Sequence, residues 1–129
     1  TIPNSVNSIG KYIFSFCRDL SSIVIESSNT KYDSRDNCNA IIETESNTLI
    51  AGCMNTIIPN SVTAIGNWAF SGCTNLTSVL IPNSVEKLGA DSFYGCTALE
   101  TISLPNSLNE ITTVTFQECT NIKTIISHI

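Results

Sequence analysis

A repeat of 23 residues is the feature that most limits what this chain can fold into. Prolines recur at that spacing, each inside an aliphatic-Pro-Asn-Ser-aliphatic string, at Pro59, Pro82 and Pro105, and Pro3 begins a further copy. Fixed offsets from the prolines carry a phenylalanine (Phe14, Phe70, Phe93, Phe116) and a cysteine (Cys17, Cys73, Cys96, Cys119). A unit this short cannot bury its apolar side alone, so successive units must stack on one another.

Each unit closes with an L-x-x-I-x-I string, in which alternate residues of a strand point inward and copies can pair in parallel. Proline has no N–H for a sheet ladder and ends the strand. The earlier V-x-x-I-G string indicates a short second strand or extended edge on the outer face. We therefore predict a β-rich solenoid, a right-handed leucine-rich-repeat-like stack of about five 23-residue coils with one parallel sheet and a buried row of phenylalanines. The predicted strands centre on Ile23, Thr56, Val79, Ile102 and Ile125.

The second coil is longer than the others, because Pro3 and Pro59 lie 56 residues apart, one unit of 23 and one of 33. Residues 38–43 and 48–53 are strand-like, and the short segment between them is typical of a β-hairpin. The predicted register pairs Glu43 with Thr48, Ile42 with Leu49, Ala40 with Ala51, and Cys38 with Cys53.

The predicted domain organisation is one leucine-rich repeat domain over residues 1–129. Its expected coils are 3–25, 26–58 with the hairpin insertion, 59–81, 82–104 and 105–127. The chain opens on Thr1-Ile2-Pro3 and closes on a strand with no polar cap. We expect it to be part of a longer array or, because open strand edges invite pairing, to associate end to end.

The stretch from Ile58 to Cys73 resembles the BspA-like leucine-rich repeat of bacterial cell-surface proteins. Residues 29–33, 39–42 and 47–53 resemble an elongated unit that recurs in such proteins. The resemblance implies a secreted or surface protein, often a large one, with a role in adhesion to host proteins or other cells. It supplies no catalytic residues.

Composition excludes several function classes. Six basic residues against eleven acidic ones give a net charge of −5, which argues against a nucleic-acid partner. No apolar run approaches the roughly 20 residues of a membrane span, so direct membrane insertion is not expected. The single histidine, His128, lies at the far terminus, and no His/Cys cluster has metal-ligand spacing. We therefore expect no enzyme activity, no metal and no cofactor.

Six cysteines in a short chain suggest a disulfide framework, but four of them share one repeat position. We interpret Cys17, Cys73, Cys96 and Cys119 as buried free thiols of low reactivity. For Cys38 and Cys53 both a bridge and two free thiols stay open, since strands facing each other often strain a disulfide.

Two further groups are interpreted as structural. The acidic residues Asp33, Asp36, Glu43 and Glu45 show no calcium-loop spacing and are expected to be solvated hairpin charges. The aromatic residues Tyr12, Trp68 and Tyr94 lie near the outer bend, where they stack on sugar or cover the coil edge. The equivalent positions elsewhere hold Asp91 and Val114, so no continuous aromatic platform is expected.

The candidate binding face is the outward side of the strands. The fifth residue of each string points away from the core, and this column is largely aliphatic: Val24, Ile57, Leu80, Ser103 and Ile126. Ser78 and Thr101 belong to a second, polar column beside it. The pattern predicts an extracellular or cell-surface recognition and adhesion module that binds a protein, or a glycan, through this face. The alternative is a structural spacer or stalk of a larger surface protein with no ligand of its own.

Overall fold

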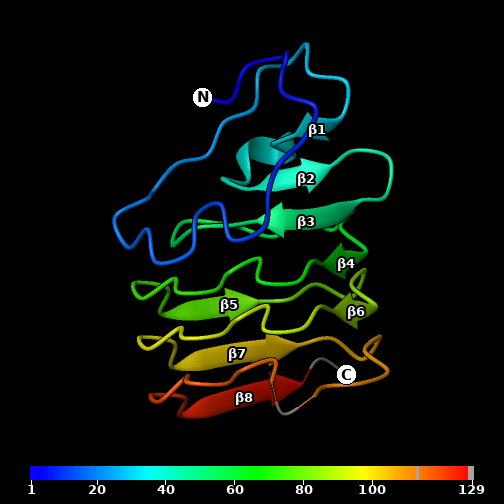
Figure 1. The fold of residues 1–129 in the computed structure, drawn as a ribbon. Helices are drawn as coiled ribbons and strands as arrows, with labels where there is room; N and C mark the ends of the chain where they lie inside the picture. The colour runs from blue at the N-terminus through cyan, green and yellow to red at the C-terminus, as the bar shows by residue number, and fades with distance from the viewer. Residues whose placement is uncertain (113, 128–129) are drawn as a thin grey trace.

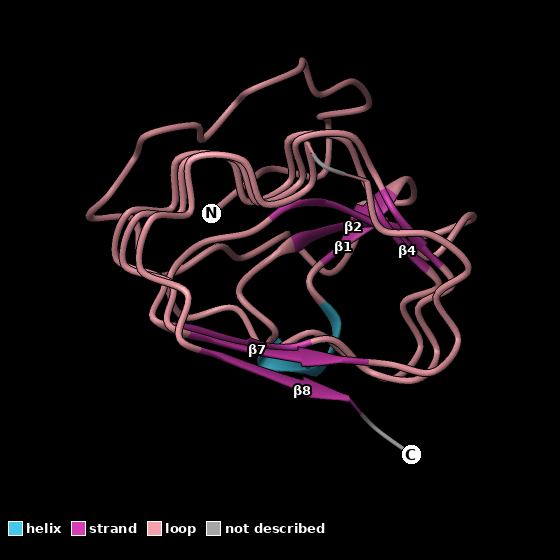
Figure 2. Ribbon diagram, turned by 90° about the horizontal axis from the view of Figure 1, so that it is seen from below, coloured by secondary structure: helices cyan, strands magenta, loops and turns pink. Residues whose placement is uncertain are grey.

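The computed structural model describes residues 1–112 and 114–127. Within them, short strands and tight turns stack one above another from the N-terminal end to the C-terminal end (Figure 1). The strands are β1 (Tyr32–Asp33), β2 (Ile41–Glu43), β3 (Thr48–Ala51), β4 (Ala64–Ile65), β5 (Ser78–Leu80), β6 (Lys87–Leu88), β7 (Thr101–Leu104) and β8 (Thr124–Ser127), with a 3₁₀ turn at Arg35–Asn37. Viewed along the stack, the turns of successive repeats superpose, as the repeat pattern requires (Figure 2).

The closing strings of the last three repeats form a parallel sheet in the order β5-β7-β8. Val79 pairs with Ile102, and Ile102 pairs with Ile125, so three of the five predicted strand centres lie in register. The prediction of one parallel sheet through all five centres is wrong. Ile23 lies outside the strands, with only an isolated bridge between Ile2 and Ile25 beside it, and Thr56 is also outside them.

Two of the V-x-x-I-G strings contribute β4 and β6 to the second sheet, which has the order β1-β2-β3-β4-β6. Ile65 in β4 pairs in parallel with Leu88 in β6, as their shared repeat position requires. On the other side Leu49 pairs with Ile65, so the hairpin strand β3 takes the place of a repeat strand in this sheet. The enlarged unit therefore joins the outer sheet and is absent from the β5-β7-β8 sheet.

The hairpin register is confirmed at Glu43 with Thr48 and at Ile42 with Leu49. The predicted pairing of Ala40 with Ala51 is wrong, because Ile41 pairs with Ala51. Ile50 is the extra residue of a β-bulge at this point. The bulge lets β2 bury consecutive residues on opposite sides: Ile42 packs in the main core, and Ile41 packs in a second cluster.

The apolar interior is divided in two. The main cluster runs through the later repeats and includes Phe70 and Phe93. A smaller cluster under the first repeat holds Ile23, Ile25 and Tyr32, with Phe14 packed against it. The hairpin contributes to both clusters and separates them, which explains why the first repeat is less buried than the others.

The predicted phenylalanine row is present in three of its four members. Phe70 and Phe93 stack with ring centroids 4.9 Å apart, and Phe93 and Phe116 with centroids 5.3 Å apart. Phe70 and Phe93 are buried, whereas Phe116 and Phe14 are half-buried. Phe14 does not extend the row, because the enlarged unit between it and Phe70 carries Gly52 at the equivalent place.

Backbone hydrogen bonds identify Gly52 as that unit's counterpart of phenylalanine. The Phe70 N–H donates to the Ser92 carbonyl of the next repeat, and the Gly52 N–H donates to the Ala69 carbonyl in the same way. A Cβ atom on Gly52 would lie 2.2 Å from Cε1 of Phe70, so the Phe70 ring occupies the space that a side chain would need.

Candidate binding surfaces

Three members of the predicted aliphatic column, Leu80, Ser103 and Ile126, lie on β5, β7 and β8, whereas Val24 and Ile57 lie outside the strands, in the closing strings of the first two units. Four of the five side chains are exposed, by 46% at Val24, 78% at Ile57, 58% at Leu80 and 49% at Ile126. Ser103 is half-buried. Large aliphatic groups exposed to this degree cost solvation free energy that small polar residues would not.

The strand register shows how close part of this column is. Leu80 pairs with Ser103 and Ser103 with Ile126, so the three side chains stand on neighbouring strands about 4.8 Å apart. Ser78 and Thr101 pair beside them in the polar column. An exposed ion pair between Lys123 and Glu100, with a nitrogen-to-oxygen distance of 3.2 Å, borders the same strands.

The cysteines form a ladder whose thiols donate to the carbonyl oxygens of the preceding repeat. The Sγ of Cys96 donates to the Phe70 oxygen at 3.1 Å, and that of Cys119 to the Phe93 oxygen at 3.0 Å. Cys73 and Cys96 are buried, as predicted, but Cys119 is half-buried and Cys17 is exposed. The prediction of burial is therefore wrong for Cys17, because the first repeat lies outside the main core. Cys38 and Cys53 are buried free thiols.

Burial also governs the acidity of these thiols. It raises the pKa of Cys73 to about 12. A hydrogen bond with Cys119, together with burial, raises the pKa of Cys96. Burial raises the pKa of Cys38 as well. A thiolate is the reactive form of cysteine, so none of these three is suited to nucleophilic chemistry at neutral pH.

We expect thiol labelling to follow this order. In the native protein Cys17 should react with a maleimide within minutes, whereas Cys38, Cys73 and Cys96 should react only after denaturation. Mass spectrometry of timed, labelled digests measures each site. Fast native labelling of Cys96 would contradict the burial of the ladder.

The raised thiol pKa values also predict how stability depends on pH. Below the ordinary thiol pKa both the folded and the unfolded chain are protonated at these sites. Between that value and the raised folded value, only the unfolded chain loses the protons, so the free energy of unfolding falls as pH rises. We expect lower stability in urea denaturation at pH 10.5 than at pH 8. A Cys73→Ala, Cys96→Ala variant should lose less stability over this interval, and an equal loss would contradict the assignment.

The acidic hairpin residues are dispersed, and one of them is paired. Burial raises the pKa of Asp33, but hydrogen bonds from Arg35 and Thr44 outweigh it, so the pKa lies below its usual range. The carboxylate accepts from Arg35 Nη2 at 2.7 Å, and Arg35 also donates to Asn47 and Ser61. Asp33 and Arg35 therefore tie the insertion to the third repeat. In the described residues no group of three or more His, Cys, Asp or Glu side chains could hold a metal ion.

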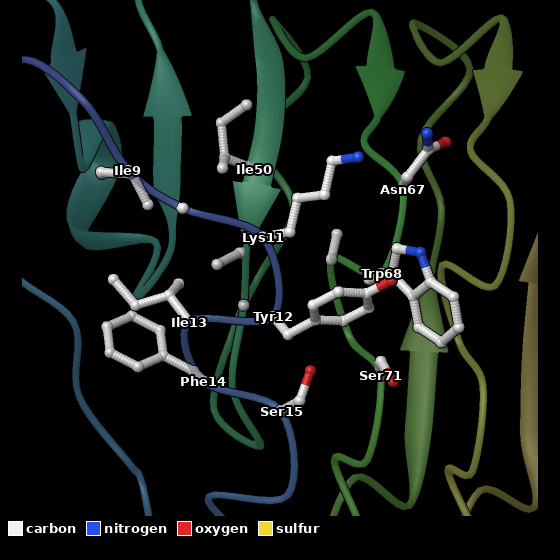
Figure 3. A pocket seen from close by; sticks show the side chains of 14 residues that line it. Ile9, Lys11, Tyr12, Ile13, Phe14, Ser15, Ile50, Asn67, Trp68 and Ser71 are labelled. Carbon is white, nitrogen blue, oxygen red and sulfur yellow. The ribbon is translucent and has the colours of Figure 1, made fainter.

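The aromatic residues at the outer bend are in contact with one another. The rings of Tyr12 and Trp68 lie edge to face with centroids 4.7 Å apart, and those of Trp68 and Tyr94 have centroids 5.8 Å apart. The rings meet at interplanar angles of 66° and 59°, so they form a cluster of three and not a flat, continuous platform. The enlarged unit has no outer corner of its own, so the first repeat crosses it and places Tyr12 directly against the third repeat (Figure 3).

A cavity of about 110 Å³ lies under this crossing segment. The first repeat lines one side, including Lys11, Tyr12 and Ser15, and Gly52, Asn67 and Trp68 line the other. Sequence reasoning missed it, although the signal was present. Only nine residues separate Leu49 from Ile58, whereas sixteen separate the equivalent Ile65 and Ile81.

Two further expectations concern the ends and the membrane. His128 lies outside the described residues. The part of the chain that the structure describes contains no helix with the length and apolar character of a membrane span.

Solved structures similar to this one are bacterial leucine-rich repeat proteins. The pneumococcal vaccine antigen PcpA matches with a TM-score of 0.76 and 22% identity, covering 96% of this chain and 34% of that one. A leucine-rich repeat protein from Eubacterium ventriosum matches with a TM-score of 0.65 and 20% identity, covering 98% of this chain and 41% of that one. A leucine-rich cell surface protein from Faecalibacterium prausnitzii matches with a TM-score of 0.56 and 25% identity, covering 98% and 46%. This chain spans less than half the length of each.

The sequence comparison is more specific. The model of the BspA type leucine-rich repeat region matches residues 1–44 and 50–128, in six copies. The residues left between the two matched ranges, 45–49, are the tip of the hairpin and the first half of β3. No curated protein matches the sequence.

Proposed function

The chain belongs to the BspA-type leucine-rich repeat family, and from this premise we propose that it is a non-enzymatic recognition and adhesion module that binds a protein partner. The binding surface in this proposal is the aliphatic column of the sheet face, with Val24, Ile57, Leu80 and Ile126 as contacts and Ser103, Ser78 and Thr101 between and beside them. The observation that carries the proposal is the exposure of the four aliphatic side chains.

Physical chemistry favours a partner over a bare surface. Large exposed apolar patches on soluble proteins commonly mark interaction sites. The neighbouring polar column shows that the strands tolerate small residues, since Ser78 and Thr101 occupy equivalent strand positions. A spacer has no use for the aliphatic residues, which favours the recognition module over the spacer. A protein fits the dry aliphatic column better than a glycan, whose hydroxyl groups require polar partners.

The remaining parts of the proposal follow from the family and the repeat pattern. A surface recognition protein acts outside the cell, so we place the chain at the cell surface or in the secreted fraction. The finer architecture in this proposal is one domain, built as a right-handed stack of about five 23-residue coils. The exposed strand β8 offers an open edge, and end-to-end association between copies is part of the proposal.

The proposal predicts the effect of changing the column. In an Ile57→Ser, Leu80→Ser variant we expect binding to immobilised host extracellular-matrix proteins to weaken about tenfold or more, or about 1.4 kcal/mol. Because both side chains are largely in water, folding should be nearly unchanged. Surface plasmon resonance against a panel of matrix proteins measures the affinity, and thermal denaturation measures the fold.

A matched control replaces two other exposed aliphatic side chains by serine. Ile111 and Val114 are exposed by 48% and 36%, and neither lies in a strand. An Ile111→Ser, Val114→Ser variant should keep the wild-type affinity. If the two variants bind equally well, the sheet face is not the binding surface.

A further inference from the structure

The cavity between the first and third repeats exists because one corner of the solenoid is missing. In the later repeats the outer corner of each unit donates backbone hydrogen bonds to the next, as Trp68 does to Ala90 and Phe70 to Ser92. The enlarged unit makes one such bond, from Gly52 to Ala69, before it turns into its closing string. The first repeat must therefore cross the gap to reach the third.

Side chains rather than a backbone ladder hold this crossing segment. The Nδ2 of Asn75 donates to the Arg18 carbonyl at 2.9 Å, across 57 positions in the sequence. The Tyr12 ring meets Trp68, and the backbone of Phe16 approaches Gly72 so closely that a Cβ atom there would lie 2.6 Å from the Phe16 nitrogen. These contacts fix both ends of the segment and leave the cavity between them.

We propose that this cavity is a carbohydrate-binding site that takes a single neutral sugar ring of a glycan, with Tyr12 and Trp68 as its aromatic wall. The site is separate from the sheet face. Ring faces carry negative charge and attract the C–H groups on the apolar face of a sugar. Tyr12 is 51% exposed at the mouth of the cavity, so an entering ring can reach it.

Polar groups suited to sugar hydroxyls line the same cavity. The Oγ of Ser15 is buried and has no hydrogen-bond partner among the described residues, which costs free energy that a ligand hydroxyl would recover. Asn67 also lines the cavity, and its Oδ1 accepts from the Ala90 N–H of the next repeat, which fixes the amide. Lys11 adds a flexible ammonium donor to the lining, and in Figure 3 its side chain extends away from the Tyr12 ring, between Ile50 and Asn67.

The chemistry and the size of the cavity select the ligand class. Lys11 is the only ionisable lysine, arginine or carboxylate side chain in the lining, so no charge cluster favours an anion or a cation. The volume of about 110 Å³ is several times the roughly 10–15 Å³ that one water requires, so the cavity suits one small ring and not an oligosaccharide. The cavity is open at Tyr12, so one sugar ring can enter it while the rest of the glycan stays outside.

The test uses the single tryptophan as its probe. Trp68 is the only tryptophan in the chain, so its fluorescence reports on the wall of the cavity alone. The whole chain is titrated with methyl glycosides of glucose, galactose, mannose and N-acetylglucosamine. We expect at least one to shift the emission saturably with a Kd of about 1 mM, as a single ring contact permits. Saturation-transfer NMR should show the ring protons of the same glycoside against the protein.

Three variants separate a site from a surface effect. Tyr12→Ala should raise the Kd about tenfold, since it removes the wall. Ser15→Ala should weaken binding while leaving the melting temperature unchanged or higher, because its hydroxyl has no partner to lose. Phe16→Ala is the matched control, as it removes an exposed aromatic ring from the same segment outside the cavity lining, and the Kd should stay within about twofold.

The outcomes are decisive for the assignment. If no glycoside shifts Trp68 emission and none shows saturation transfer, the carbohydrate site is refuted. It is also refuted if Phe16→Ala weakens binding as much as Tyr12→Ala. Should Tyr12→Ala fail to fold, Ser15→Ala carries the test, and unchanged glycoside affinity in that variant overturns the proposal.

Discussion

Replacing Phe93 by alanine should cost about 3–5 kcal/mol of folding free energy, the largest single-residue effect expected in this protein. The ring is fully buried and stacks between Phe70 at 4.9 Å and Phe116 at 5.3 Å. Its loss removes buried apolar surface and both ring contacts. It also leaves a cavity in the middle of the stack that the neighbouring repeats cannot fill. Because each repeat is supported only by its neighbours, the loss falls on both adjoining interfaces. Urea denaturation followed by circular dichroism measures the change.

Phe16→Ala is the control for this effect. The same atoms are removed, but Phe16 is 61% exposed and has a φ of 61°, a strain that alanine shares. Its cost should therefore stay below about 1 kcal/mol. Similar losses of stability in the two variants would show that the phenylalanine stack does not dominate the core.

The repeat spacing predicted much of this architecture, because a residue at a fixed offset in a stacked unit has a fixed neighbour in the next. That reasoning placed Val79, Ile102 and Ile125 in register and put Phe70 and Phe93 inside. It also placed Leu80 and Ile126 on the exposed face. Each of these residues lies in a regular 23-residue repeat that has another regular repeat beside it.

The wrong predictions concern residues in or beside the enlarged unit, where the 23-residue spacing is interrupted. A local pattern cannot say which sheet an inserted hairpin joins, and β3 pairs with β4 instead of extending the expected parallel sheet. The bulge at Ile50 shifts the hairpin partners by one residue, since both sides of β2 have a core to fill. Cys17 and Phe14 have the right repeat position but no full-length repeat beside them, so neither is fully buried.

The candidate surfaces divide in the same way. The aliphatic column follows from strand alternation alone and was accessible from the sequence. The aromatic wall was not, because Tyr12 and Trp68 meet only if the unit between them lacks an outer corner. Their contact depends on the length of the enlarged unit and on the path of the first repeat across it. The positions of the two aromatic residues in their repeats indicate neither.

Gly52→Ala should cost about 1–3 kcal/mol of folding free energy, and it tests the packing from which the missing corner follows. The new methyl group would lie 2.2 Å from Cε1 of Phe70 and 2.6 Å from its Cζ. Phe70 is buried and stacked on Phe93, so its ring cannot turn aside without disturbing the row. Gly10→Ala is the control, since nothing lies within 4 Å of the added Cβ atom. That variant should be neutral or slightly stabilising.

A double-mutant cycle shows whether the clash with Phe70 is the cause. Phe70→Leu removes ring atoms from the place that the new methyl group needs, and alone it should destabilise the fold because it leaves space beside Gly52. In the double variant the methyl group that Gly52→Ala adds partly fills that space. Its loss of stability should therefore be about 0.5–3 kcal/mol smaller than the sum of the two single losses. Strict additivity would mean that the alanine acts through the backbone. The Phe70 ring would then not be the reason that the enlarged unit has glycine where the other repeats have phenylalanine.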